Sequence, residues 1–173
     1  MRRIGDFLLD HPSVVTGSLI GMVLAQFVVS LWIPAVAVSA PFDGLGTERR
    51  QVAVSALALG VAGVAAMVGG FSGVVVLFGL SSIDQRFRTV RLMASTSLQR
   101  NWMSVVTTPL AAAFGSLLAS ALASAGATSV ALWALEACVL LAAHGAIRLV
   151  VVLFELVKVV DESDAAAEQS LAD

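Results

Sequence analysis

Charged residues are scarce in this sequence of 173 residues. Only 13% of its residues are charged and 58% are hydrophobic, and its mean hydropathy is +0.94. Soluble domains contain roughly 25% charged residues, because charged side chains keep their surfaces hydrated. The composition therefore excludes a soluble globular fold, a disordered chain and a coiled coil. We expect an integral membrane protein.

The sequence also lacks the residues on which many catalytic and binding sites depend. Cys138 is its single cysteine, so neither an internal disulfide nor a CxxC redox pair can form. The formal net charge of −2 provides no basic field, so we expect no nucleic-acid partner. No phosphate-binding loop, nucleophile elbow or paired metal-ligand spacing occurs. We therefore predict no enzyme, no cofactor and no metal site.

The sequence contains three long stretches without ionisable side chains. They cover residues 12–42, 51–83 and 101–135, and each exceeds the roughly 20 residues that cross a bilayer as a helix. The apolar character of the third stretch continues further, but the small and polar cluster 124–129 is typical of a turn. We predict an all-α bundle of four transmembrane helices in one domain, residues 1–160. The expected spans are about 14–38, 52–80, 103–125 and 130–152.

The distribution of arginine predicts the orientation of these spans. Four spans bring the amino terminus, the 84–100 connection and the carboxyl tail to one side, which collects at least six arginines. Cytoplasmic loops carry the excess of positive charge, so we place both termini in the cytoplasm. Arginine outnumbers lysine nine to one, which indicates a GC-rich prokaryotic genome. The expected location is the inner membrane of a prokaryote.

Two connecting segments are amphipathic. Residues 1–9 predict a short interfacial helix, and the 84–100 segment predicts a cytoplasmic amphipathic helix. The second helix would either rest on anionic headgroups as a positive anchor or bind a cytoplasmic partner or anionic lipid. Its candidate binding residues are Arg86, Arg88 and Arg91. The acidic tail, residues 161–173, is expected to be either a frayed helix end or a solvated segment.

Small residues recur at helical spacing in the first three spans. In a bilayer such residues let helix backbones approach closely, and hydroxyl groups can bond between helices. We expect them to pack the bundle, and the alternative is a track of hydroxyls along a pore. The candidate packing residues are Gly17, Gly21, Gly63, Gly70, Ser116 and Ser120.

Ionisable residues gather on one face of the fourth span. At 100° per residue, five of them fall within an arc of about 120°. These residues are Glu136, His144, Arg148, Glu155 and Lys158. A random scatter would seldom be so narrow, so this face is the most informative pattern in the sequence.

Depth separates the residues of this face. With about 1.5 Å of rise per residue, Glu136 lies about 9 Å and His144 about 21 Å from the outer edge. Arg148 lies about 27 Å from that edge, close enough to the inner surface to snorkel. Gln26 is the most polar side chain of the first span and requires a hydrogen-bond partner. We select Glu136, His144, Arg148 and Gln26 as polar-path candidates, with structural roles as the alternative.

The expected function follows from this polar face. The first hypothesis is a small homo-oligomeric channel or transport protein whose fourth helix faces the permeation path. The second is a non-catalytic accessory or interaction subunit of a larger membrane complex. A third and weaker hypothesis is a lipid-modifying enzyme or a membrane-permeabilising protein. The expected partners are the lipid bilayer, anionic headgroups, and a second copy or another membrane protein.

Overall fold

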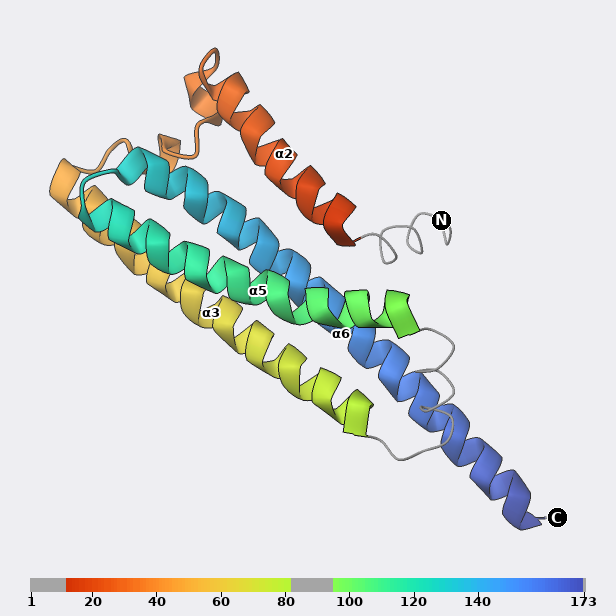
Figure 1. Cartoon of the computed structure of the whole chain (residues 1–173). Coiled ribbons are helices and arrows are strands. Elements are labelled where there is room, and N and C mark those ends of the chain that lie inside the picture. Colours follow the sequence, from red (N-terminus) through yellow and green to blue (C-terminus); the bar gives the residue numbers. More distant parts are fainter. Residues whose placement is uncertain (1–11, 82–94, 173) are drawn as a thin grey trace.

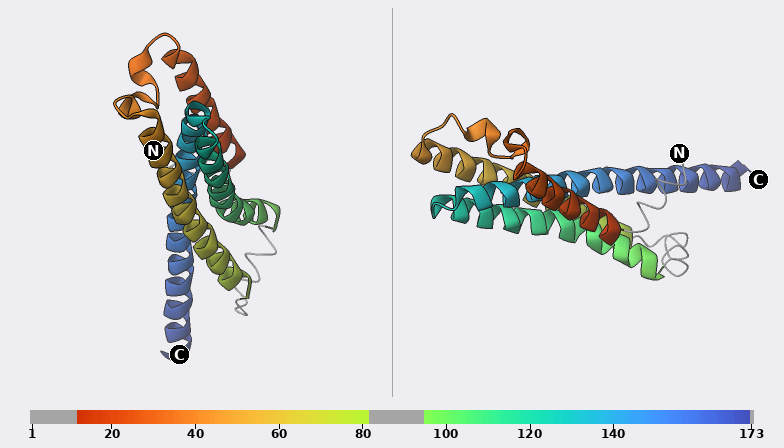
Figure 2. Two further views of the ribbon diagram at one scale, coloured as in Figure 1. Left: turned by 90° about the vertical axis from the view of Figure 1, so that its left-hand side faces the viewer. Right: turned by 90° about the horizontal axis from the view of Figure 1, so that it is seen from above.

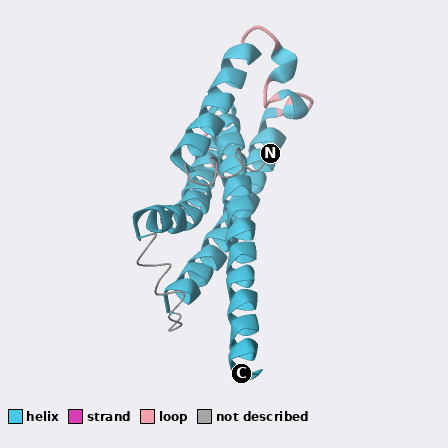
Figure 3. Ribbon diagram, turned by 90° about the vertical axis from the view of Figure 1, so that its right-hand side faces the viewer, coloured by secondary structure: helices cyan, strands magenta, loops and turns pink. Residues whose placement is uncertain are grey.

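The computed structural model describes residues 12–81 and 95–172, and these ranges contain helices and no strand (Figure 1). The all-α, four-helix prediction is confirmed for the described residues. The four α-helices are α2 (Pro12–Ser30), α3 (Thr47–Ser81), α5 (Ser95–Ser124) and α6 (Thr128–Ala172). Two short 3-10 helices, η1 (Pro34–Val36) and η2 (Ala40–Phe42), lie in the connection between α2 and α3 (Figure 3).

Helices α3, α5 and α6 form a bundle, and α2 packs chiefly against α6 (Figures 1 and 2). Helices α3 and α6 run in one direction, and α2 and α5 run in the other. The start of α2, the end of α3, the start of α5 and the end of α6 therefore point toward the same end of the molecule. This is the alternation that we predicted from the order of the spans.

Three helices are long and apolar enough to cross a membrane. Their apolar parts are Thr47–Phe78, Trp102–Ser124 and Thr128–Lys158. The whole of α6 has 45 residues. At about 1.5 Å per residue it is roughly 68 Å long, more than twice the thickness of a hydrocarbon core. The segment 161–172 is helical as the end of α6, so it continues the fourth helix.

The first predicted span, residues 14–38, is too long. Helix α2 ends at Ser30, because Pro34 has no N–H to donate and its ring disfavours a helical conformation at the preceding residue. Ile33 accordingly has φ −127° and ψ 89°. The apolar part of α2, Val14–Ser30, is shorter than the three long apolar helices. Four long spans are thus corrected to three long helices and a shorter one.

The turn between α5 and α6 occurs where the small-residue cluster predicted it. Gly126 has φ +91°, a left-handed conformation that glycine adopts without steric cost. The N–H of Gly126 donates to the carbonyl of Ala123, and the N–H of Ala127 donates to the carbonyl of Leu122. These two bonds form a Schellman motif, which satisfies the last carbonyls of α5. A connection this short keeps α5 and α6 antiparallel and in contact.

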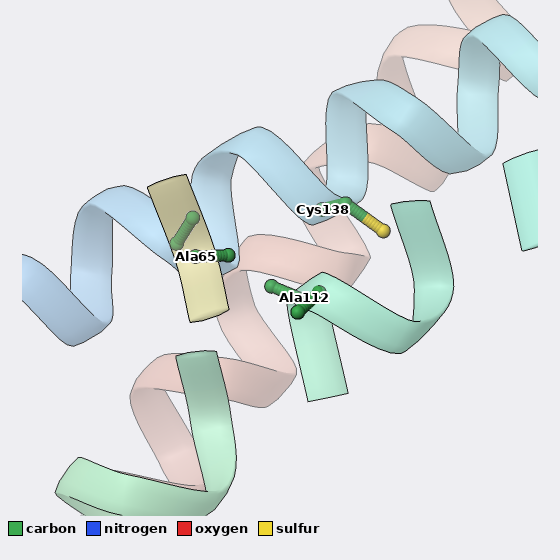
Figure 4. Close-up of a cluster of buried hydrophobic side chains, with 5 residues drawn as sticks. Ala65, Ala112 and Cys138 are labelled. Carbon is green, nitrogen blue, oxygen red and sulfur yellow. The ribbon is translucent and has the colours of Figure 1, made fainter. Parts of the chain in front are cut away.

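The core of the bundle is built largely from alanine. One cluster joins Ala65 of α3, Ala112 of α5 and Cys138 of α6, whose side chains gather between the three helices (Figure 4). Two further clusters lie toward the end of the bundle that holds the α2–α3 connection and the α5–α6 turn, which we call the loop end. They include Ala58, Ala119 and the larger Leu132. Small side chains allow close backbone approach, which supplies the dispersion contacts that hold apolar helices together in lipid.

Several predicted features lie outside the described residues. They are the interfacial helix at 1–9, most of the amphipathic segment 84–100, and the three arginines Arg86, Arg88 and Arg91. Helix α5 begins at Ser95, so the end of the 84–100 segment has a helical backbone.

Candidate functional site

The polar face of α6 contains two buried atoms that lack partners. Oε2 of Glu136 and Nε2 of His144 have no hydrogen-bond partner among the residues that the structure describes. Both side chains are partly buried. A buried polar atom without a partner is destabilising by about 1–3 kcal/mol, so such atoms are rare in native folds. Two of them on one face of one helix mark this face as a candidate site.

Helix α2 lies against this face. The rings of Phe27 on α2 and Trp133 on α6 meet edge to face, with centroids 5.3 Å apart. Glu136 follows Trp133 by three residues, and His144 follows it by eleven, about three helical turns. Both therefore lie on or beside the face that Trp133 presents to α2. The Phe27–Trp133 contact, together with Glu136 and His144 on or beside the same face of α6, is called the α2–α6 seam.

Arg148 is directed into the bundle. Its side chain is 5% exposed, and Nη1 donates a hydrogen bond to the hydroxyl of Ser104 on α5. Arg148 therefore reaches an acceptor on α5, whereas the sequence suggested only that it could snorkel to the inner surface. The helix rotation places the guanidinium beside α5, where a hydroxyl acceptor is within reach. Arg148 thus ties α5 to α6 and leaves Glu136 and His144 as the groups of the seam.

Gln26 lies near the loop end of α2. Its Nε2 donates to the backbone carbonyl of Val36 at 3.3 Å, so the side chain ties the end of α2 to η1. The predicted first span, residues 14–38, would have placed Gln26 near its middle. Because α2 ends at Ser30, Gln26 lies in its last turns.

Among the described residues, the candidate packing glycines do not lie at close contacts between helices. A Cβ built on Gly17, Gly21, Gly63 or Gly70 would meet no atom of another element within 4 Å. Helices approach closely at three other glycines instead. A Cβ would lie 2.9 Å from Leu110 at Gly69, 2.6 Å from Cys138 at Gly115, and 3.0 Å from Pro109 at Gly145.

The serines of α5 contact α3. Ser120 and Ser55 share a hydrogen bond of 2.7 Å between their hydroxyl oxygens, and the Ser120 hydroxyl also lies 3.3 Å from the Ser55 carbonyl. Ser124 donates to the carbonyl of Ser120 within α5. Ser116 is fully buried. The bonds of Ser120 hold α3 and α5 together and do not line an open track.

A groove lies between α3 and α6. Its volume is about 520 Å³, and it is lined by alanine, glycine, valine and leucine residues. Those on α6 are Val139, Ala142, Ala143 and Ala146. The groove offers no polar side chain, so it can accept an apolar segment or a lipid chain and cannot coordinate an ion.

Sequence reasoning missed Ser104, Gly115 and Gly145. Each acquires its role from a residue on a neighbouring helix, and nothing in the local sequence distinguishes it from other serines and glycines. Within residues 12–81 and 95–172, no group of three histidine, cysteine or acidic side chains could hold a metal ion. Comparison of the chain with known protein families, curated proteins and solved structures found no match.

Proposed function

We propose that this chain is an integral membrane protein that conducts ions along the α2–α6 seam. The observation that carries this proposal is a pair of buried atoms on one face of an apolar helix, Oε2 of Glu136 and Nε2 of His144, which have no hydrogen-bond partner among the described residues. Ionisable groups in a bilayer are costly and rare, and ion pathways and proton relays are among the functions for which they are retained.

Three long apolar helices support the membrane assignment. Large apolar side chains are exposed along their outer faces, among them Met67, Phe71, Phe114 and Leu118. A soluble chain would leave this surface in water, whereas the acyl chains of a bilayer solvate it. In this arrangement the inner membrane of a prokaryote is the proposed location, with the end of α6 in the cytoplasm.

Weak attachment of α2 supports a path at the seam. Helices α3, α5 and α6 contact one another along much of their length, whereas α2 packs chiefly against α6 (Figure 2). A helix with few contacts is the element that opens at low free-energy cost. Movement of α2 away from α6 would hydrate Glu136 and His144 without disturbing the bundle.

Flux measurements on purified protein in liposomes test this proposal. The expected result is flux of at least one of H⁺, K⁺, Na⁺ or Cl⁻ over a range of pH, reduced when Glu136 is replaced by Gln. Ser18→Ala is the matched control, because Ser18 is exposed on α2 and bonds only to the Val14 carbonyl of its own helix. Absence of flux for every ion would overturn the proposal.

A second candidate function is that of a non-catalytic subunit in a membrane assembly. The observation in its favour is that Gly60 and Gly63 are exposed on α3. A Cβ built on either would meet no atom of the described residues within 4 Å, and Gly60 also borders the apolar groove. Small residues on an outer face suit close packing with a helix of a second copy or another membrane protein. Isolation of the protein in mild detergent tests this function. A stoichiometric foreign partner would support the subunit role, and a pure self-oligomer would contradict it.

A further inference from the structure

We infer that the ion conducted along the α2–α6 seam is the proton, with Glu136 and His144 as successive proton carriers. This inference rests on the proposed function and names its substrate. Carboxyl and imidazole groups both bind and release protons near neutral pH when their surroundings tune them. Each has a polar atom that is buried and free of any hydrogen bond to the described residues, so each is available to a water molecule.

The spacing of the two carriers requires water between them. Eight residues separate Glu136 from His144, which is about 12 Å along the helix axis. A file of roughly three or four waters covers this distance at ordinary hydrogen-bond lengths. The Glu136 carboxyl gives its proton to the first water, and the last water gives a proton to Nε2 of neutral His144. The imidazolium then releases the proton on its other ring nitrogen, the Glu136 carboxylate takes up a new proton from the opposite end of the path, and His144 returns to its first tautomer, so both groups regain their starting states and no charge accumulates.

The side chain between the carriers discriminates against larger ions. Leu140 lies one turn after Glu136 and one turn before His144 on the same face. A hydrated K⁺ or Na⁺ would lose water ligands there and find no oxygen atoms to replace them. An apolar constriction of this kind excludes such ions, while a proton crosses it along a transient file of water.

Few other ionisable groups lie near the seam, so Glu136 and His144 are the two groups there that can exchange protons. No ionisable side chain occurs in α2 over residues 12–30, in α3 over 51–81 or in α5 over 101–124. On α6 itself, Arg148 follows His144 by one turn and is bonded to Ser104. The other ionisable residues of this face, Glu155 and Lys158, follow His144 by about 17 and 21 Å along the helix axis. At the loop end of the bundle, Arg50 lies 3.7 Å from Asp43 as an ion pair.

Proton uptake by liposomes that contain the full chain and a pH-sensitive dye tests the inference. A K⁺ gradient with valinomycin supplies the driving potential. We expect Glu136→Gln and His144→Gln each to lower the proton flux by about tenfold or more, since each removes a carrier. Ser18→Ala should retain the flux. Wild-type proton flux in either carrier variant would overturn the inference.

A variant that gains K⁺ flux is also needed, because a variant that loses proton flux could simply be misfolded. Leu140→Ser adds a hydroxyl oxygen and removes the apolar constriction, so we expect K⁺ flux to appear in addition to proton flux. Flux of K⁺ or Cl⁻ without proton flux in the wild-type protein would overturn the inference and leave the proposed function standing. Absence of flux for all ions would overturn both.

Discussion

Gly115 lies where α5 meets α6, and a Cβ at this position would be 2.6 Å from Sγ of Cys138. Because Cys138 is buried among core residues, relieving the contact requires either a new rotamer of Cys138 within the packed core or a shift of a helix. We expect Gly115→Ala to lower the free energy of unfolding by about 1–3 kcal/mol, as overpacking of a core does. Thermal unfolding in detergent micelles measures this change.

Gly63→Ala is the matched control for this substitution. Gly63 is also within a helix, but a Cβ there meets nothing within 4 Å. Alanine favours a helix over glycine by up to about 1 kcal/mol, so this variant should unfold at the same or a higher temperature. Equal destabilisation by the two substitutions would contradict the close contact at Gly115.

Ser104 accepts a hydrogen bond from the buried guanidinium of Arg148. Removing an acceptor from a buried charged donor costs about 1.5–3 kcal/mol, so we expect Ser104→Ala to destabilise the bundle by that amount. Ser18→Ala, which affects only a bond within α2, should have little effect. A double-mutant cycle with Arg148→Leu isolates the pair, and a coupling energy near zero would show that the bond contributes nothing.

The sequence did not reveal the roles of Ser104 and Gly115, because each role depends on a residue of another helix. Ser104 and Arg148 are far apart in the chain, and so are Gly115 and Cys138. The sequence identified Arg148 as an unusual residue, because a cation in an apolar helix is rare. It did not identify the acceptor, since any of several hydroxyls on other helices could have met it. Which one does depends on how the helices are rotated about their axes.

At the scale of elements, Gly126 determines where α5 ends and α6 begins. Its φ of +91° lies in the left-handed region, which costs a residue with a side chain about 1–2 kcal/mol. We expect Gly126→Ala to destabilise the α5–α6 hairpin by this amount in a denaturant titration. Gly44→Ala, in the α2–α3 connection at a glycine without a positive φ, should be close to neutral. Equal effects at both positions would argue against the Schellman turn.

The elements themselves were predictable to different degrees. The extent of α3 and α5 follows from apolar runs that end in charge or in small polar residues, and prediction and structure differ by a few residues within the apolar parts. The end of α2 was missed, although Pro34 is the local signal for it, because hydropathy continues past Ser30 into η1 and η2. Trp32, which is 84% exposed, lies just after α2 and not inside a span.

At the scale of the whole molecule, α3 carries the chain from one end of the bundle to the other. If it crosses a bilayer, the α2–α3 connection and the end of α6 lie on opposite sides of it. In a Cys138→Ala background, we expect Gly44→Cys to react with an impermeant thiol reagent from outside intact cells. Ala166→Cys should react only after the membrane is opened. Labelling of both positions from outside would contradict the proposed topology.

The sequence alone determined that the chain is helical, where its apolar helices lie, and that one helix carries ionisable groups, since these properties depend on local composition. Only the tertiary structure decided which groups meet. Arg148 is bonded to α5, and α2 packs against α6. Within residues 12–81 and 95–172, Oε2 of Glu136 and Nε2 of His144 have no hydrogen-bond partner. The physical reason is that helices apolar on all sides carry little local information about which face turns inward. Contacts between distant residues fix that rotation.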